Sequence, residues 1–189
     1  MSIGILFDLD GTLLNTLEDL RDATNAALRH FGCPERTLEE IRTFVGNGAR
    51  NQIRLSLPEE VNHPPLEEVL DYYQEYYNRT SADGTAAPYP GVMEAIDKLG
   101  QKYKLAIVSN KPDYAVKLIC NQMFPGIYGV GERQGTPRKP APDMVYKAMD
   151  AMGVEACVYV GDSEVDVATA KNAGADCLCV LWGFRDQQM

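Results

Sequence analysis

The sequence predicts an α/β protein with a doubly wound, mostly parallel sheet, into which a helical domain is inserted after the first strand. Beyond Pro90 and Gly91, short continuous apolar runs alternate with helical patterns, which is typical of a parallel sheet covered on both faces. Between residues 16 and 78 the pattern is helical, and no strand pattern interrupts it. The chain therefore divides into a core, residues 1–14 and 86–189, and an insertion, residues 15–85.

The first strand is predicted at Ile3–Phe7, and it runs directly into Asp-Leu-Asp-Gly-Thr at positions 8–12. Side chains at i and i+2 of an extended backbone lie on one side, so we expect Asp8 and Asp10 to share a small volume at the end of this strand. Two such charges repel unless a cation lies against them or one stays protonated. The segment is either an ordinary Asp-Gly turn or a hydrolytic site with a nucleophile and an acid.

The insertion is predicted to contain four helices. They start near Thr16, Thr37, Gly48 and Leu66. Thr16 and Thr37 are each followed three residues later by an acidic residue, the pattern of a helix cap, and Gly32 ends the first helix. The small polar stretch 80–85 is interpreted as the linker that returns to the core.

The core beyond the insertion is predicted to alternate strands and helices. The strands are apolar runs at 105–108, 127–130, 158–160 and 177–181. The helices lie near 92–101, 113–122, 142–152 and 164–173. Loops that leave the carboxyl ends of such strands converge on one crevice, so functional residues are expected there.

Polar residues in three of these loops suit an anion or metal site. Ser109 and Asn110 follow one strand, where they could bind an anion with free backbone N–H groups or simply cap the next helix. Lys139 lies in a proline-rich loop and is either a site cation or an exposed charge. Asp162 and Asp166 follow another strand and are either site acids or helix caps.

Composition excludes several classes of function. The net charge of −9 and the pI near 4.7 argue against nucleic acid or an anionic membrane as a partner. No stretch has the apolar length of a membrane span and no signal-peptide pattern opens the chain, which predicts a cytoplasmic protein. With two histidines, no Cys-x-x-Cys pair, no Gly-x-Ser-x-Gly elbow and no Walker loop, a multi-histidine metal site, a zinc ribbon, a serine hydrolase and a P-loop NTPase are not expected.

In order and context, the motifs resemble those of the haloacid dehalogenase-like phosphohydrolases. They are Asp-Leu-Asp-Gly-Thr at 8–12, Ser-Asn at 109–110, Lys-Pro at 139–140 and Gly-Asp-Ser-x-x-Asp at 161–166. The insertion resembles the small four-helix cap of the phosphoglycolate phosphatase-like branch, and residues 46–50 and 88–91 are similar to segments of that branch. The resemblance covers nearly the whole chain and implies a Rossmann-like core.

The resemblance also implies roles for individual residues. Asp8 would be the nucleophile that attacks phosphorus and forms an aspartyl-phosphate, and Asp10 the acid and later the base. The implied cofactor is Mg²⁺, held by the Asp8 carboxylate, the backbone carbonyl of Asp10 and Asp162, with Asp166 nearby. The residues expected around the transferring phosphoryl group are Thr12, Ser109, Asn110 and Lys139.

Substrate selection is assigned to the cap. We hypothesise that the backbone of Gly46, Asn47 and Gly48, together with Arg50, meets a carboxylate or second anionic group on a small phosphorylated metabolite such as phosphoglycolate. Alternatively, Arg50 is a surface charge. The segments near Asn15 and 80–85 are expected to act as hinges for closure over the site.

Particular residues argue against other activities. Asp10 argues against a dehalogenase, and the absence of any lysine before Lys98 excludes a phosphonate hydrolase that uses a cap lysine. Two alternatives remain: a sugar-phosphate mutase, and a nucleotide or pyrophosphate phosphatase. The mutase is less favoured because Thr12 stands where mutases commonly have an aliphatic residue. A phospho-accepting switch has a different motif order, and an inactive binding module is disfavoured because no motif residue is missing.

Two features depart from the family pattern. Asn15 stands where relatives often have Asp, and the chain stops at Met189, soon after Trp182-Gly183-Phe184, where relatives usually continue. A truncated chain would leave a sheet edge or core face uncovered. The oligomeric state is not predicted.

Overall fold

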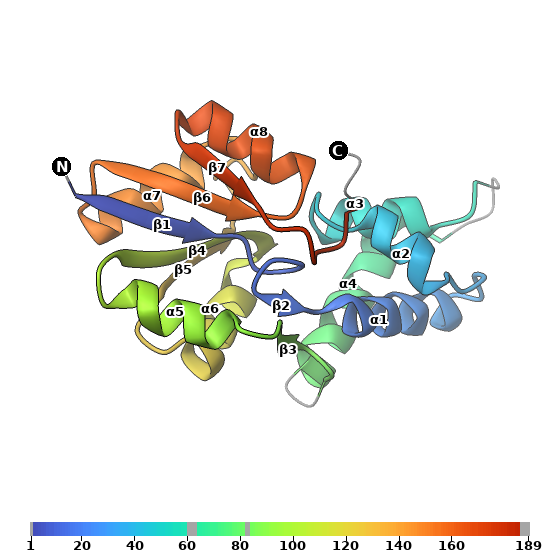
Figure 1. The fold of residues 1–189 in the computed structure, drawn as a ribbon. Helices are drawn as coiled ribbons and strands as arrows, with labels where there is room; N and C mark the ends of the chain where they lie inside the picture. The colour runs from blue at the N-terminus through green and yellow to red at the C-terminus, as the bar shows by residue number, and fades with distance from the viewer. Residues whose placement is uncertain (1, 60–63, 82–83, 186–189) are drawn as a thin grey trace. The chain divides into compact units, whose positions relative to one another are not determined.

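The computed structural model describes residues 2–59, 64–81 and 84–185. Their contacts divide the chain into two compact units: a core unit, drawn from Met1–Leu14 and Pro88–Met189, and an insertion unit, drawn from Asn15–Ala87. The chain passes between them through two short paired strands, β2 (Leu14–Asn15) and β3 (Ala87–Pro88), which the sequence did not predict (Figure 1).

The core unit contains a five-stranded parallel sheet in the order β5-β4-β1-β6-β7. The strands are β1 (Ile3–Phe7), β4 (Lys104–Pro112), β5 (Tyr128–Glu132), β6 (Ala156–Gly161) and β7 (Asp176–Cys179). The chain fills one side of the central strand β1 and then crosses to fill the other, which confirms the predicted doubly wound α/β core. The switch in strand order places β1, between β4 and β6, at the crevice where ligands bind in such folds.

Helices cover both faces of this sheet. They are α5 (Val92–Gly100), α6 (Asp113–Met123), α7 (Asp143–Met152) and α8 (Glu164–Ala173). Neighbouring residues of one strand point to opposite faces: Leu6 packs with residues of α7 and α8, whereas Phe7 packs with residues of α5 and α6. The continuous apolar runs of the central strands are therefore explained by burial on both sides.

Strand β4 continues beyond the predicted strand end at Val108. Residues 109–112 remain in the strand, and Pro112 pairs with Glu132 of β5 after a shift in register. The side chains of Ser109, Asn110 and Lys111 are polar but buried, and they form hydrogen bonds or ion pairs with other polar groups. A prediction based on apolar runs stops too early here.

The insertion unit contains four helices. They are α1 (Leu17–His30), α2 (Leu38–Phe44), α3 (Ala49–Ser56) and α4 (Leu66–Thr80). Fully buried Ile41, Ile53 and Val69 lie in its core. The expected cap forms at Thr37, which exchanges hydrogen bonds with Glu40, but the Thr16 side chain makes no cap hydrogen bond.

The predicted linker 80–85 is partly outside the described residues, which omit 82 and 83. At its end, the backbone N–H groups of Thr85 and Ala86 donate to the carboxylate of Asp19. This carboxylate fixes the returning chain against α1 within the insertion unit.

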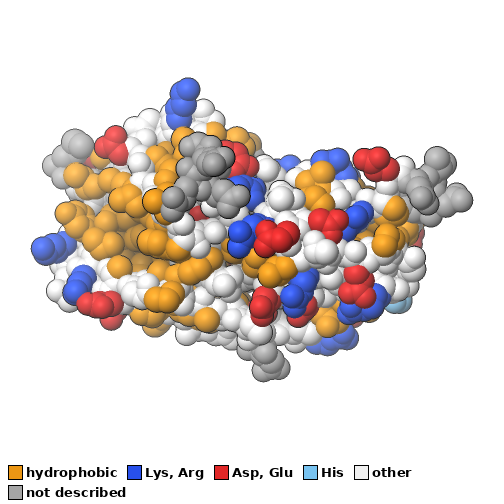
Figure 2. Space-filling view, turned by 45° about the vertical axis from the view of Figure 1, so that its right-hand side comes forward, with side chains coloured by type: hydrophobic (Ala, Val, Ile, Leu, Met, Phe, Trp, Pro, Cys, Tyr) orange, Lys and Arg blue, Asp and Glu red, His pale blue; other side chains and the backbone are white. Residues whose placement is uncertain are grey.

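Strand β7 forms one edge of the described sheet, and all four of its residues are exposed. Leu178, Leu181 and Trp182 are among the exposed apolar side chains of the core unit. On the face drawn in Figure 2, hydrophobic side chains gather over the core unit, at the left. Residues 186–189, at the chain end where truncation is expected, lie outside the described residues. Among the described residues, no helix combines the length and apolar character that a membrane crossing requires.

Candidate active site

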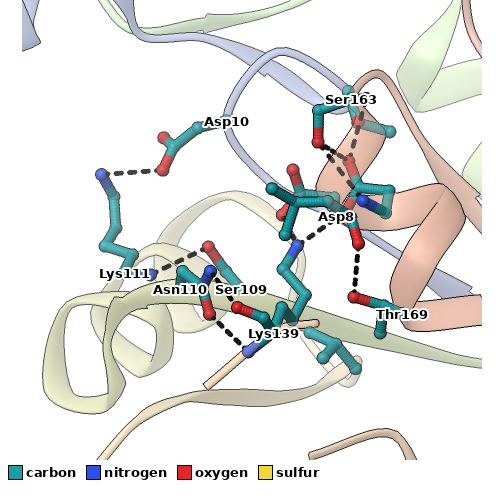
Figure 3. A network of polar contacts seen from close by, with 12 residues as sticks. Asp8, Asp10, Ser109, Asn110, Lys111, Lys139, Ser163 and Thr169 are labelled. Carbon is teal, nitrogen blue, oxygen red and sulfur yellow. Dashed lines mark hydrogen bonds and ion pairs between the residues drawn. The ribbon is translucent and has the colours of Figure 1, made fainter. Parts of the chain in front are cut away.

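Four charged side chains from three distant segments meet at the carboxyl end of the central strands, and Figure 3 labels two of them, Asp8 and Lys139. Asp8 follows β1, Lys139 precedes α7, and Asp162 and Asp166 follow β6. All four are buried. Charged groups are rarely buried unless they are paired, so their convergence marks a site and not a surface cluster.

The ammonium of Lys139 lies at the centre of this cluster. Its Nζ donates to Asp8 Oδ1 at 2.7 Å, to Asp166 Oδ1 at 2.8 Å and to the Tyr159 hydroxyl at 3.1 Å. These three acceptors match the three N–H donors of an ammonium. Burial alone would lower the pKa of Lys139, but the charges of Asp166 and Asp8 outweigh burial and hold the pKa well above its usual range.

Asp166 belongs to the capping box of α8, in which Ser163 is the N-cap residue, and it also contacts Lys139. Its Oδ2 accepts hydrogen bonds from the Ser163 hydroxyl at 2.6 Å and from the backbone N–H groups of Ser163 and Asp162, while Oδ1 faces Lys139. The start of α8 is thereby fixed to the site.

Burial and like charge disfavour the ionised carboxylates. The pKa of Asp8 is raised well above its usual range, chiefly by burial and then by the charge of Asp166, with Lys139 opposing. Burial also raises the pKa of Asp162 to about 6, although the backbone N–H of Phe184 donates to Asp162 Oδ2 at 2.7 Å. A cation beside these groups would stabilise their charged forms.

The carboxylates offer a fitting set of ligands for a hard divalent cation. Asp8, Asp162 and Asp166 each present an oxygen, and these oxygens lie within 4.8 Å of one another. Oxygen donors of this kind suit Mg²⁺. The side chain of Asp10 is not part of this cluster, and its predicted contribution through a backbone carbonyl stays a prediction.

Glycines leave room for two of these carboxylates. A Cβ built on Gly11 or Gly183 would overlap Asp162, and one on Gly161 would overlap Asp166. Gly11 also has a φ of 89°, a conformation that side chains disfavour. The two carboxylates therefore fit only because these three positions are glycines, since the Cβ of any other residue there would overlap them.

The expectation that Asp8 and Asp10 share one small volume is wrong. Asp8 faces Lys139, whereas the Asp10 carboxylate pairs with Lys111, with Nζ 3.1 Å from Oδ2 (Figure 3). The i, i+2 rule requires an extended backbone, but β1 ends at Phe7 and the next residues form a turn in which N–H groups of residues 12–14 donate to the Leu9 carbonyl. The turn separates the two side chains.

Ser109 and Asn110 lie on the extended end of β4. Helix α6 begins at Asp113 after Pro112, so the alternative in which Ser109 caps this helix is excluded. Asn110 accepts from the Lys139 backbone N–H at 2.8 Å and donates to the Lys139 carbonyl at 3.1 Å. It therefore holds the loop that carries Lys139, and its predicted contact with substrate stays a prediction.

Thr12 is buried, and its hydroxyl donates to Asp162 Oδ1 at 3.3 Å. Its backbone carbonyl accepts a hydrogen bond from the Trp182 indole N–H at 3.1 Å. The turn after β1, the segment after β6 and the segment after β7 are thus linked around Asp162.

The predicted substrate-binding residues Gly46, Asn47, Gly48 and Arg50 lie in the insertion unit. Gly48 precedes α3 with a φ of 79°, as a tight loop requires. The side chain of Arg50 is exposed and pairs with Glu67 at 2.5 Å. The role of this loop toward a substrate stays a prediction.

Sequence reasoning missed three contributors to the site. Lys111 follows Ser109 and Asn110 directly, and this position is the signal that could have identified it. Tyr159 lies in an apolar strand, but a buried tyrosine hydroxyl usually forms a hydrogen bond, and this is the signal that could have identified it. The contribution of Phe184 comes from its backbone, which no residue type reveals.

Residues 5–180 match the haloacid dehalogenase-like hydrolase family. The chain belongs to this family. It is 32% identical over 189 residues to phosphoglycolate phosphatase 1 of Pseudomonas aeruginosa, an alignment that covers 95% of this chain and 70% of the relative. It is 34% identical to the phosphoglycolate phosphatase of Cereibacter sphaeroides, over 96% of this chain and 86% of that protein.

Solved structures of haloacid dehalogenase-like proteins share this fold. A candidate phosphoglycolate phosphatase from Lactobacillus delbrueckii subsp. bulgaricus superimposes with a TM-score of 0.88 at 36% identity, over 97% of this chain and 88% of that one. CbbY from Rhodobacter sphaeroides, solved with phosphate, has a TM-score of 0.83 at 25% identity, over 100% of this chain and 90% of that one.

Proposed function

We propose that this haloacid dehalogenase-like hydrolase is a magnesium-dependent phosphatase that hydrolyses a small phosphorylated metabolite, with phosphoglycolate as the leading candidate. One observation carries the proposal: the Asp8 carboxylate lies buried at the end of β1, held by Lys139 beside Asp162 and Asp166. Relatives named phosphoglycolate phosphatases along 95% of the chain support the phosphatase activity and the choice of substrate.

Asp8 is proposed to be the nucleophile. Its carboxylate attacks phosphorus, a new bond forms between them, and the bond between phosphorus and the ester oxygen breaks. Asp10 gives a proton to the departing alkoxide and later removes one from the water that hydrolyses the aspartyl-phosphate, so that both residues return to their starting states.

The remaining residues orient Asp8 and stabilise the phosphoryl group during its transfer. Lys139 fixes the orientation of Asp8 and places a positive charge in a protein that is otherwise acidic. In the arrangement described, its three N–H groups are directed at protein acceptors, so its effect on the phosphoryl group is one of charge and not of a direct hydrogen bond. Ser109 and Thr12 are proposed to contact phosphoryl oxygens.

Mg²⁺ would be held by Asp8 and Asp162, with Asp166 beside them, and when bound would neutralise charge on the phosphoryl oxygens. The donor set supports this assignment because all three residues present carboxylate oxygens within one small volume.

The test is phosphate release by the purified protein from phosphoglycolate, glycerol phosphate and para-nitrophenyl phosphate, with Mg²⁺ and with a chelator. We expect turnover only with the metal, and the highest kcat/KM for phosphoglycolate. Asp8→Asn should lower kcat by at least about a thousandfold, whereas Asp97→Asn, which changes an exposed acid on α5, should not. A wild-type protein inactive on all three esters would refute the phosphatase, and a flat profile among them would refute only the substrate.

A further inference from the structure

Lys111 is a buried lysine that the proposed mechanism leaves without a role. Its ammonium lies 3.1 Å from the carboxylate of Asp10, and the two side chains are only 5% and 15% exposed. Lysine usually keeps its charged end in water, and burying an ion is costly unless a partner compensates. The fold therefore maintains this pair despite the cost of desolvating both groups.

The backbone of Lys111 is part of the sheet and is closely packed. Its N–H donates to the Ser109 hydroxyl at 3.2 Å within the extended end of β4. On the other side, its carbonyl packs so closely against Gly131 of β5 that a Cβ at Gly131 would lie 2.5 Å away. Pro112, the next residue, pairs with Glu132 of the same strand. The lysine side chain thus extends from a fixed base.

Asp10, by contrast, lies in a turn. The turn comes after β1 has ended, and it includes Gly11 in a left-handed conformation. A short carboxylate on a turn has several possible directions, and the ion pair with Lys111 selects one of them. The ion pair therefore ties the side chain of Asp10 to β4, a strand of the sheet.

We propose that Lys111 is a positioning residue for Asp10, which it holds where the carboxyl group exchanges protons with the leaving group and the attacking water. This inference rests on the proposed phosphatase function. It predicts that removal of the ammonium impairs the step that Asp10 assists and leaves the binding of the phosphoryl group unchanged.

The test compares two esters that differ in their need for an acid. An alkoxide, as in phosphoglycolate or glycerol phosphate, needs a proton as it leaves, whereas nitrophenolate leaves readily without one. Because kcat/KM reports the steps up to transfer of the phosphoryl group to Asp8, it isolates this difference from the later attack of water. K111M should lower kcat/KM for the alkyl ester by about ten- to a hundredfold, the scale of a misplaced catalytic group, but for para-nitrophenyl phosphate by less than about threefold.

Two further variants make the test specific to the pair. D10N alone and D10N/K111M together should lose nearly the same activity on the alkyl ester, because Lys111 acts through Asp10. K111R keeps a cation within reach and should recover part of the loss. The matched control is K117M, which removes a half-exposed lysine that pairs with Asp113 on α6 and should leave both substrates unaffected.

The outcomes separate this inference from the function on which it rests. If the wild type hydrolyses neither ester, the phosphatase proposal fails and the role of Lys111 fails with it. If the wild type is active, equal losses on both esters would show that Lys111 binds the phosphoryl group, and additive losses in D10N/K111M would show that it acts independently of Asp10; either result overturns the inference alone. K111Q provides the same comparison should K111M unfold at a lower temperature than the wild type.

Discussion

At the scale of single residues, Tyr159 links strand β4 to the charged cluster through one hydroxyl group. The ring is fully buried; the hydroxyl donates to the Val108 carbonyl at 3.1 Å and accepts from Lys139 at the same distance. Burial holds the pKa of Tyr159 well above its usual range, so the group stays a protonated donor. A buried hydroxyl group of this kind stabilises the fold mainly because its removal would leave buried polar groups without hydrogen-bond partners.

Tyr159→Phe should therefore lower the free energy of unfolding by about 1–3 kcal/mol, because the Val108 carbonyl and one Lys139 N–H lose their partner. We also expect a lower kcat with little change in KM. Urea unfolding at constant m-value measures the first effect. The control is Tyr103→Phe at an exposed tyrosine, and equal stability of the Tyr159 variant and the wild type would contradict the argument.

Asp113 illustrates how pH acts on a structural carboxylate outside the site. Burial alone would raise its pKa, but hydrogen bonds from Arg133, the Gly131 backbone and Lys117 outweigh burial and lower it. A carboxylate with a lowered pKa in the folded state contributes stability that is fully present above its unfolded pKa, about 3.9, and lost as the pH falls through the folded value.

The wild type should thus be more stable than Asp113→Asn at pH 7, and the difference should shrink as the pH falls below about 4. Chemical denaturation of both proteins over this range gives the measurement. Asp97→Asn, at an exposed position, serves as the control. A difference in unfolding free energy that does not change with pH would refute the role of the charge.

At the scale of secondary-structure elements, the sequence identified most strands and helices because their patterns are local. Apolar runs gave β1, β5 and β6, and capping and periodicity gave the helices of the insertion. The end of β4 was not predictable in this way, since Ser109, Asn110 and Lys111 are polar and a search for apolar runs stops before them. The prediction that Asp10 lies beside Asp8 failed for a related reason. It assumed an extended backbone, but a turn follows the strand.

Helix α2 offers a direct test of one such local signal. Thr37 and Glu40 form a reciprocal capping box, so Thr37→Ala should lower the free energy of unfolding by about 1 kcal/mol. Thr43→Ala, an exposed threonine on the same helix, should change it by less than about 0.5 kcal/mol. Thermal or urea unfolding of both variants gives the comparison, and equal losses would show that the cap adds nothing.

At the scale of the whole molecule, the order of four motifs along the chain was more informative than any one of them. Each had an ordinary explanation alone, but the parallel sheet brings three of the segments together around Lys139, and the family match confirms the predicted haloacid dehalogenase-like fold. The phosphoglycolate phosphatase relatives confirm the predicted phosphatase class. The assignment of substrate selection to the insertion unit, where Arg50 pairs with Glu67, stays a prediction.

Metal binding should be visible in the stability of the whole protein. Mg²⁺ that binds only the folded state raises the unfolding temperature, by an amount that grows with its concentration over its dissociation constant. Millimolar Mg²⁺ should therefore raise the Tm of the wild type, whereas Asp162→Asn should remove most of this shift. Asp97→Asn should keep it. A wild-type Tm that does not respond to Mg²⁺ would argue against the proposed metal.

The hydrogen bond from Phe184 to Asp162 is donated by the main chain, so most side-chain substitutions at position 184 would not remove it. An alanine scan across this segment would leave the N–H donor intact and report only the loss of side-chain packing. Proline lacks this donor, so any loss in Phe184→Pro beyond that in Phe184→Ala would expose a dependence of Asp162 on the backbone of this segment.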